Sequence, residues 1–378
     1  MISRAQITKH PLSEYLTEYK ELNTGNKYRP VAVGRYGIRT RESIYSKDLA
    51  QDYSKNRLIH KGTLTVGMGS VQMDIGILSD DVTYSVSPAY HTYRISGIDY
   101  DYLRYCLQCR NMDMFTRFMK RGSRQGKSID LDRWIGYEIP VYPREAQFEI
   151  VDRLKCAQSI VNKLQQELSE LDDLIKARFV EMFGMCSVRR RLEEYTELIT
   201  KGASPKWQGI DYCDEGTLFV TSENVREGYV DLSKRKYLPD DINRILPRSV
   251  LRRNDVLINI VGASIGRAAI FESDELANIN QAVAVVRVKK GLLDLHFLIT
   301  FLNSEEAQKA YSCMKKGGAR DNLSLQNIAD LLIPVVTIEA QEQFAAFISQ
   351  VDKSKAAVQQ ALDEAQLLFD SLMQKYFC

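Results

Sequence analysis

The 378-residue sequence is poor in the residues that build metal centres, disulfide frameworks and membrane spans. It has only 4 histidines, and its 7 cysteines are odd in number and irregularly spaced, which is not the pattern of a disulfide framework. Cys106-x-x-Cys109 has no second Cys or His pair nearby, so we expect no metal site. The longest apolar stretches, such as Leu331–Val336, are far too short to span a membrane. Because the first residues do not resemble a signal peptide either, we expect a soluble, cytoplasmic protein.

Motifs that carry catalysis are also missing. We find no Asn-Pro-Pro-Phe/Tyr or Asp-Pro-Pro-Tyr motif for methylation of a base, no glycine-rich cofactor loop after a first strand, and no Gly-x-x-x-x-Gly-Lys-Ser/Thr phosphate loop. Gly67-x-Gly69 and Gly262-x-x-x-Gly266 are better explained as tight turns or sites of close backbone approach. We therefore expect no catalytic residues and no cofactor.

What the sequence does contain is an internal repeat. Residues 145–183 recur in altered form, without a gap, at 339–377. The step of 194 residues is about half the chain, so the protein is one unit used twice. The same step relates other landmarks, namely Ile139-Pro140 with Ile333-Pro334, Glu145-Ala-Gln147 with Glu339-Ala-Gln341, and Leu64–Ser70 with Ile258–Ser264.

Apolar residues recur in both copies by alternating steps of four and three. In the first copy this stripe consists of Ile150, Leu154, Ala157, Val161, Leu164, Leu168, Leu171, Ile175, Arg178 and Met182. In the second copy it consists of Phe344, Ile348, Val351, Lys355, Val358, Leu362, Ala365, Phe369, Leu372 and Tyr376. A strict seven-residue period keeps one stripe facing a partner helix. We therefore predict two helices, each ~55 Å long at 1.5 Å per residue, that pack antiparallel as a coiled coil.

The segments before the two helices share an order of elements. Each has strands rich in Val, Thr and Tyr, then a helical stretch (Tyr100–Met119 or Leu293–Tyr311), then a basic loop (Lys120–Lys127 or Lys315–Arg320). We therefore predict an α+β fold in four parts: a first domain (1–143), a first long helix (144–184), a second domain (185–337) and a second long helix (338–378). The two domains are called the first and second lobes below.

The net charge of +2 is unevenly placed. Both long-helix segments have more Asp and Glu than Lys and Arg, so the lobes carry the positive charge. Basic lobes on acidic helices suit a protein that offers the lobes to phosphate and the helices to other proteins. The alternative is that helix surfaces simply favour Glu and Asp, and charge alone does not exclude it.

With the repeat laid out, the chain resembles the DNA-specificity subunits of type I restriction–modification enzymes over nearly its whole length. In that family each of two target-recognition domains is followed by a long helix, and the helix opens after a Pro-containing strand end. Here the openings are Ile139-Pro-Val-Tyr-Pro-Arg-Glu-Ala-Gln147 and Ile333-Pro-Val-Val-Thr-Ile-Glu-Ala-Gln341. The strand and glycine-rich turn Asp255–Arg267 also fits the family, whereas the first lobe departs from it at Gly67–Gly76.

The resemblance implies a non-catalytic subunit of a DNA methyltransferase and endonuclease complex. Its partners would be double-stranded DNA, methyltransferase (M) subunits and restriction/translocase (R) subunits. The two lobes would recognise a bipartite target at a spacing set by the helices, because equivalent groove faces of duplex DNA recur every ~34–36 Å.

Candidate contacts follow from the chemistry of DNA, since Arg, Asn, Gln and short hydroxyls recognise base edges while Lys and Arg mostly hold phosphates. In the first lobe the candidates are Arg35, Arg39, Arg41, Ser70, Gln72, Lys120, Arg121 and Arg124. In the second they are Lys206, Asn224, Arg226, Ser264, Arg267, Gln281, Lys316 and Arg320. Trp207 and Tyr90 are candidates for stacking or wedging, with a core role as the alternative. For the partner interface we expect exposed apolar residues of the long helices: Phe148, Leu174, Phe179, Phe183, Leu368 and Phe377.

Two other functions compete with this interpretation. A coiled-coil scaffold whose lobes bind proteins would explain the heptads but not the duplicated basic loops. A self-sufficient enzyme acting on nucleic acid would need the catalytic motifs that are missing.

Overall fold

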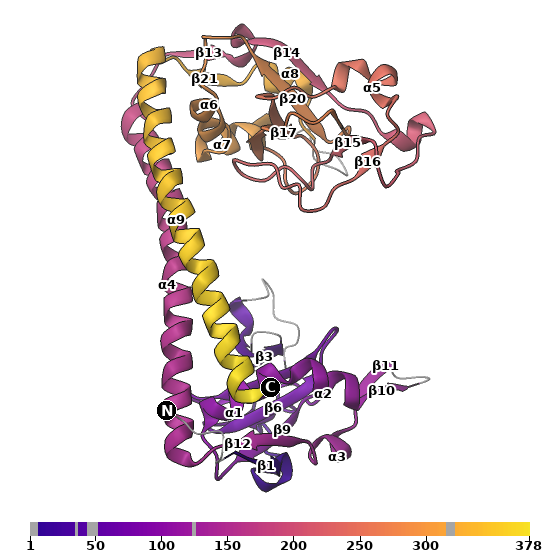
Figure 1. The fold of residues 1–378 in the computed structure, drawn as a ribbon, viewed down its shortest axis with the longest axis vertical. Helices are drawn as coiled ribbons and strands as arrows, with labels where there is room; N and C mark the ends of the chain where they lie inside the picture. Colours follow the sequence, from indigo (N-terminus) through magenta and orange to yellow (C-terminus); the bar gives the residue numbers. More distant parts are fainter. Residues whose placement is uncertain (1–6, 35–36, 44–51, 123–125, 315–321) are drawn as a thin grey trace. The chain divides into compact units, whose positions relative to one another are not determined.

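The structure, a computed structural model, describes residues 7–34, 37–43, 52–122, 126–314 and 322–378 (Figure 1). Its residues form two compact units: residues 1–165 with 360–378, and residues 166–359. The fold contains both helices and sheets, which confirms the α+β prediction. Within the described ranges, no helix is both long and apolar enough to cross a membrane.

The first unit is built around a four-stranded antiparallel sheet with the order β2-β9-β6-β7. Its central strand β6 is rich in β-branched residues and largely buried, as expected of a strand with neighbours on both sides. The strands of this sheet are β2 (Leu16–Glu18), β9 (His91–Ile95), β6 (Thr63–Met68) and β7 (Met73–Leu78). Two-stranded sheets are formed by β1 (Thr8–Pro11) with β12 (Glu138–Val141), β3 (Val31–Gly34) with β4 (Gly37–Thr40), β5 (Arg57–Ile59) with β8 (Tyr84–Val86), and β10 (Met119–Gly122) with β11 (Gly126–Ile129).

The second unit repeats this frame. Its four-stranded antiparallel sheet has the order β14-β20-β17-β18, made of β14 (Thr196–Lys201), β20 (Val283–Val288), β17 (Val256–Asn259) and β18 (Ala268–Ile270). The pair β13 (Arg189–Arg191) and β21 (Leu332–Pro334) corresponds to β1 and β12. A three-stranded sheet of β16 (Tyr237–Leu238), β15 (Thr217–Val220) and β19 (Ala277–Ile279) is particular to this unit. The sheet order is therefore duplicated along with the sequence, while the additions to it differ.

Each helical stretch predicted in the lobes is split by an asparagine. The first consists of α1 (Tyr100–Cys109) and α2 (Asn111–Phe118), and the second of α6 (Leu295–Leu302) and α7 (Glu305–Met314). The Asn111 side chain accepts from the Met73 N–H at 2.9 Å and donates to the Met73 carbonyl at 3.0 Å. Asn303 makes the same pair of bonds with Ala268, both at 2.9 Å. Each amide thus binds the first residue of an edge strand, β7 or β18, beside the break between the two helices.

The remaining short helices are single turns. In the first unit they are η2 (Leu12–Glu14), η3 (Arg41–Ser43) and α3 (Leu131–Trp134). In the second they are η4 (Leu192–Tyr195), η5 (Pro205–Gln208), α5 (Ile242–Ile245), η6 (Pro247–Ser249) and α8 (Leu325–Ala329). The corresponding turns α3 and α8 are both capped by a side chain, of Asp130 and Ser324 respectively.

The glutamine of each Glu-Ala-Gln repeat joins a long helix to its lobe. Gln147 is 3% exposed, and its side chain accepts from the Asp99 N–H at 3.0 Å and donates to the Tyr142 carbonyl at 2.8 Å. Gln341 is 2% exposed and bonds in the same way to the Asp294 N–H at 2.8 Å and the Val336 carbonyl at 3.1 Å. Asp99 and Asp294 are the N-caps of α1 and α6. The repeated sequence is therefore explained by a repeated structural contact.

The two long helices are α4 (Arg144–Phe183) and α9 (Ile338–Phe377), each with 40 residues. Every position of the two stripes is buried or half-buried. Within the second unit the helices run antiparallel, since Lys355 pairs with Asp172 at 2.5 Å while Phe344, earlier in α9, contacts Phe183, later in α4. In the first unit the start of α4 and the end of α9 share one core, which includes Ile150 and Tyr376.

The ends of both helices enter the cores of the lobes more deeply than the stripe predicts. Phe179 and Phe183 pack against Phe297 of α6 and Phe344 of α9, and Phe377 packs against Tyr102 of α1 with 5.2 Å between ring centroids. Cys378 is paired with Cys109 through their sulfur atoms. The sequence did not indicate this cysteine pair because 269 residues separate its members.

We predict that replacing either repeated glutamine with alanine destabilises the protein. Gln147→Ala and Gln341→Ala each leave a backbone N–H and a carbonyl at a partly buried junction without their partner, at a cost of up to roughly 1–3 kcal/mol per group. Gln166→Ala, in the exposed middle of α4, is the matched control and should cost little. Denaturant unfolding measures the three free energies. Equal unfolding midpoints for all three variants would contradict the structural role assigned to these glutamines.

Candidate nucleic-acid interface

The candidates around the glycine turn of the first lobe lie on the hairpin of β6 and β7. Ser70 is exposed and Gln72 is half-buried, and both lie in the turn between the strands. Gly67 is required for space, because a Cβ there would collide with the ring of Tyr90. The Tyr90 hydroxyl donates to the Val33 carbonyl at 2.8 Å, and its ring packs on the small core of β3, β5 and β8. Tyr90 therefore has the core role that was the alternative to stacking.

In the second lobe the equivalent turn follows β17. Arg267 is exposed, and the half-buried Ser264 accepts from the Asn259 side-chain amide at 3.1 Å. Gly262 and Gly266 have φ angles of 84° and 89°, which glycine adopts without strain. Gln281 is exposed. It lies beside the turn, because the carbonyl of its neighbour Ala282 accepts a hydrogen bond from the Ile260 N–H at 2.9 Å. The fold thus brings together three of the candidates: Ser264, Arg267 and Gln281.

Asn224 is not available to DNA as predicted. It is 6% exposed, and its carbonyl oxygen accepts from the Thr221 N–H at 2.9 Å and the Thr221 hydroxyl at 3.0 Å. Its NH₂ group donates to the Asp231 carbonyl at 2.9 Å and the Lys234 carbonyl at 3.2 Å. Asn224 therefore shapes the 221–234 loop, on which the half-buried Arg226 pairs with Asp231 at 3.5 Å. An asparagine that suits base recognition by chemistry has been used here to hold a loop.

The basic loop expected at Lys120–Lys127 is a β-hairpin of β10 and β11, with Met119 opposite Ile129 and Gly122 opposite Gly126. Lys120 is exposed and pairs with Asp130 at 2.9 Å. In the hairpin of β3 and β4, Arg39 is exposed, and the following Arg41 lies 5.6 Å from the centre of the Tyr53 ring. Arg35, Arg124, Lys316, Arg320 and the side chain of Arg121 lie outside the described residues.

Lys206 and Trp207 lie on the single turn η5 of the second unit. Both are exposed, and Trp207 is 85% exposed, the opposite of the burial that an indole usually finds in a core. The other tryptophan, Trp134, is fully buried beneath the sheet of the first unit, where its N–H donates to the Met114 sulfur at 3.3 Å. Trp207 therefore keeps the stacking role as a candidate.

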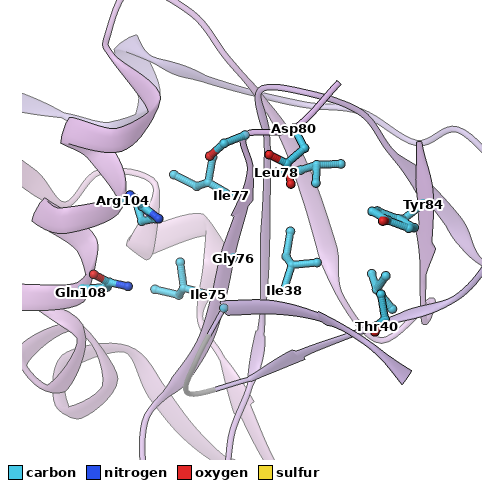
Figure 2. A pocket seen from close by; sticks show the side chains of 13 residues that line it. Ile38, Thr40, Ile75, Gly76, Ile77, Leu78, Asp80, Tyr84, Arg104 and Gln108 are labelled. Carbon is cyan, nitrogen blue, oxygen red and sulfur yellow. The ribbon is translucent and has the colours of Figure 1, made fainter. Parts of the chain in front are cut away.

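A separate hollow of about 380 Å³ lies between α1, β7 and the hairpin of β3 and β4 (Figure 2). Arg104 and Gln108 come from α1 on one side, Thr40 and Tyr84 lie on the other, and Ile38, Ile75 and Gly76 lie between them. Ile38 and Thr40 alternate with Arg39 along β4, so Arg39 faces away from the hollow. Arg104 is held by Asp101 at 2.8 Å.

The histidines of the first unit lie at its surface, and Cys106 lies in its core. No group of three or more His, Cys, Asp or Glu side chains is placed there to hold a metal ion. His10, His60 and His91 pair with Glu14, Glu21 and Glu18 on the surface of the first unit. Burial in the core raises the pKa of the Cys106 thiol to about 12, which disfavours the thiolate that binds metals.

The predicted partner face retains three of its six residues. Phe148, Leu174 and Leu368 are 47%, 47% and 52% exposed. Phe179, Phe183 and Phe377 are instead buried, at 6%, 2% and 1% exposure, because they fill the cores of their own units. The prediction was wrong at these three residues because, near the helix ends, a second column of apolar residues beside the heptad stripe packs against a lobe. In the sequence, this column has the same pattern as an apolar surface that binds a partner protein.

Comparisons with known proteins agree with this architecture. Residues 190–366 match the family model described as the type I restriction modification DNA specificity domain. The chain is 29% identical over 273 residues (63% of its length) to the type I restriction enzyme EcoBI specificity subunit of Escherichia coli. It is 21% identical over 246 residues (59% of its length) to the MjaVIII specificity subunit of Methanocaldococcus jannaschii. Each match spans 57% of the length of the relative.

Two solved structures share the fold over the whole chain. One comes from a study of complex assembly and conformational transition of the type I R-M system, with a TM-score of 0.61, 16% identity, and coverage of 100% of this chain and 98% of that one. The other is the type I restriction-modification S subunit from M. genitalium, with a TM-score of 0.52, 13% identity and the same coverage. The fold and the repeated frame define two lobes of one architecture, and residues 190–366, which include most of the second lobe, match the specificity domain. The chain is similar to specificity subunits of type I restriction–modification enzymes.

We predict that Phe183 and Leu174 behave differently when shortened to alanine. Phe183→Ala empties a site surrounded by three aromatic rings and should lower the free energy of unfolding by about 3–5 kcal/mol. Leu174→Ala removes a half-exposed side chain and should cost about 1 kcal/mol or less, yet it should weaken capture of a partner on the exposed helix face. Denaturant unfolding and co-purification with the M subunit measure the two effects. Similar stability losses in both variants would contradict the division of the apolar helix residues into core and partner face.

Proposed function

We propose that the chain is the non-catalytic DNA-specificity subunit of a type I restriction–modification complex in the cytoplasm. It binds double-stranded DNA through its two lobes, recognises a bipartite target, and recruits M and R subunits through the helices. The observation that carries the proposal is the duplicated frame: the same sheet order, asparagine contact and glutamine contact occur in both units, while the surface turns differ. Two recognition domains that face different sequences need this combination.

The two lobes differ in the side chains of their surface turns, which are the positions proposed to contact DNA. Ser70 and Gln72 occupy the turn of the first lobe, and Ser264, Arg267 and Gln281 gather at that of the second. Such side chains bind base edges and phosphates. Loops on a rigid frame can change sequence without loss of the core, which is how one fold serves many targets. A scaffold that binds only proteins does not account for Gln72 at the first turn and for Arg267 and Gln281 at the second.

The target is tested by methylome sequencing of cells that express the chain with its M subunit. We predict that the wild type directs methylation to a bipartite motif, and that exchange of residues 12–143 for the equivalent lobe of a relative changes one half of the motif only. A motif that appears equally without the chain, or a change of both halves on exchange of one lobe, would contradict the proposal. A protein-only scaffold would leave the methylome unchanged.

We also predict that Trp207 stacks on DNA. Because Trp134 is buried, a change in tryptophan fluorescence on addition of duplex DNA should come from Trp207. The test uses the complex with the M subunit. The part of the fluorescence that is missing in Trp207→Phe is the emission of Trp207, and it should be quenched when target duplex is added to the wild type. Trp207→Ala should weaken binding roughly tenfold, given that base–aromatic stacking contributes about 1–3 kcal/mol. An emission difference that duplex leaves unchanged would assign the exposed indole another role.

A further inference from the structure

A second hollow in the first unit is basic, and the sequence did not reveal it. It has a volume of about 480 Å³ and is lined by Lys9, Arg110, Arg117, Phe118, Arg133, Gly136, Tyr137 and Glu138. Four of these residues are cations and one is a carboxylate. The cations come from β1, from the junction of α1 and α2, from α2 and from α3, so only the fold brings them together.

Two of the arginines are held in place by a hydrogen-bonded network. The Arg117 Nε donates to Asp113 at 2.7 Å, the Tyr137 hydroxyl donates to the same carboxylate at 2.6 Å, and Arg110 donates to the Tyr137 hydroxyl at 3.2 Å. The bond from Tyr137 and the pairing with Arg117 hold the pKa of Asp113 below its usual range, so this carboxylate stays ionised and keeps the arginines oriented. Fixed guanidinium groups lose little freedom when they bind an anion.

The other two cations are exposed and form no ion pair with a described residue. Within the described part of the chain, neither Lys9 nor Arg133 has a carboxylate at salt-bridge distance. Arg110 likewise forms its bond with a neutral hydroxyl, and its Nε is buried without a partner. A concave surface with this excess of positive charge favours a bound anion.

The hollow adjoins the root of the basic hairpin of β10 and β11. Arg117 lies two residues before β10 begins, and Arg133 lies four residues after β11 ends. The root is closed by the Asp130 N–H, which donates to the Phe118 carbonyl at 2.8 Å. The hollow therefore lies beside the start of the hairpin that carries Lys120, one of the predicted DNA contacts.

We propose that this hollow binds a backbone phosphate of the DNA on the side of the first lobe, with Lys9 and Arg133 as its exposed ligands and Arg110 and Arg117 as its fixed ones. The proposal rests on the proposed function and adds a specific contact to it. Arginine-rich sites suit phosphate because the guanidinium can give two parallel N–H bonds to its oxygens. Continuity with the hairpin favours DNA over an acidic segment of a partner protein.

Three of the cations of this hollow have no unpaired cation at the matching described positions of the second unit, although its frame is the same. Arg189 takes the place of Lys9 in the register opposite the Ile-Pro strand end, but its guanidinium is paired with Glu306 at 3.1 Å. Matching Met119-Lys-Arg-Gly to Met314-Lys-Lys-Gly places the uncharged Ser312 at the position of Arg117. Matching Leu131 to Leu325 places Asn327, whose side chain caps α8, at the position of Arg133. The phosphate contact is therefore expected on the first half of the target only.

The test uses the double variant Lys9→Gln and Arg133→Gln in the complex with the M subunit. Both residues are exposed, so the thermal unfolding midpoint should stay unchanged. The slope of log K against log salt should fall by about 0.9 for each phosphate that is no longer neutralised, which at ~0.1 M salt is about eightfold in affinity per phosphate. Target and non-target duplexes should be weakened alike, because phosphate contacts do not discriminate sequence. The control is Lys61→Gln with Lys290→Gln, which removes the same charge from two exposed turn positions.

A second measurement locates the contact. Single neutral methylphosphonate linkages placed along the target should weaken the wild type at one or two positions beside the half recognised by the first lobe, and the double variant should lose that sensitivity. The proposal is overturned if the double variant keeps the wild-type salt slope, or if the control loses as much. Loss of M-subunit binding with DNA affinity intact would instead assign the hollow to an acidic protein segment. Wild-type complex with no preferred duplex would count against the proposed function, whereas specific wild-type binding with an unchanged double variant counts against the hollow alone.

Discussion

The structure depends on two side-chain amides in each unit, which are buried except for the half-buried Asn303. One, from Gln147 or Gln341, ties the start of a long helix to the N-cap of the first helix of its lobe. The other, from Asn111 or Asn303, ties the break in the lobe's helical segment to the start of an edge strand. An amide both donates and accepts, so it fits a backbone N–H and carbonyl in only one orientation. Apolar residues of similar size would fill the space without fixing the register, and they would leave those backbone groups unpaired.

These contacts connect the frame to the candidate interface. Asn111 binds Met73, the residue that follows the turn containing Ser70 and Gln72. Asn303 binds Ala268, the residue after Arg267. In both units a rigid helix junction therefore holds one end of the turn proposed to face DNA. The turn residues between these fixed points are free to differ, and they do differ between the lobes.

Much of this fold could be predicted from the sequence, because its strongest signals are periodic. The seven-residue stripe is buried or half-buried at every position, and the duplicated landmarks lie on corresponding strands and helices. What escaped prediction depends on contacts between residues far apart in the chain. Asn224 was mistaken for a DNA contact because its chemistry suits both base edges and loop backbones, and only the fold shows which it meets. Phe183 was mistaken for a partner contact because periodicity gives a helix face but not its neighbour. The basic hollow escaped notice because its cations lie on four separate elements.

The two lobes can differ at their surfaces because exposed residues contribute less than buried residues to the free energy of folding. Core amides and aromatic rings at the helix ends are surrounded by other side chains, so a change at Gln341 or Phe183 is felt by the whole unit. An exposed lysine or arginine such as Lys9 or Arg133 contributes little to stability and can be replaced without harm to the fold. The first lobe has unpaired cations at the base of its hairpin, whereas Arg189 of the second is neutralised by Glu306. Under the proposed function, a duplicated frame with such freedom at its surface lets each lobe bind its own half of the target differently, while the glutamine contacts between helix and lobe stay the same.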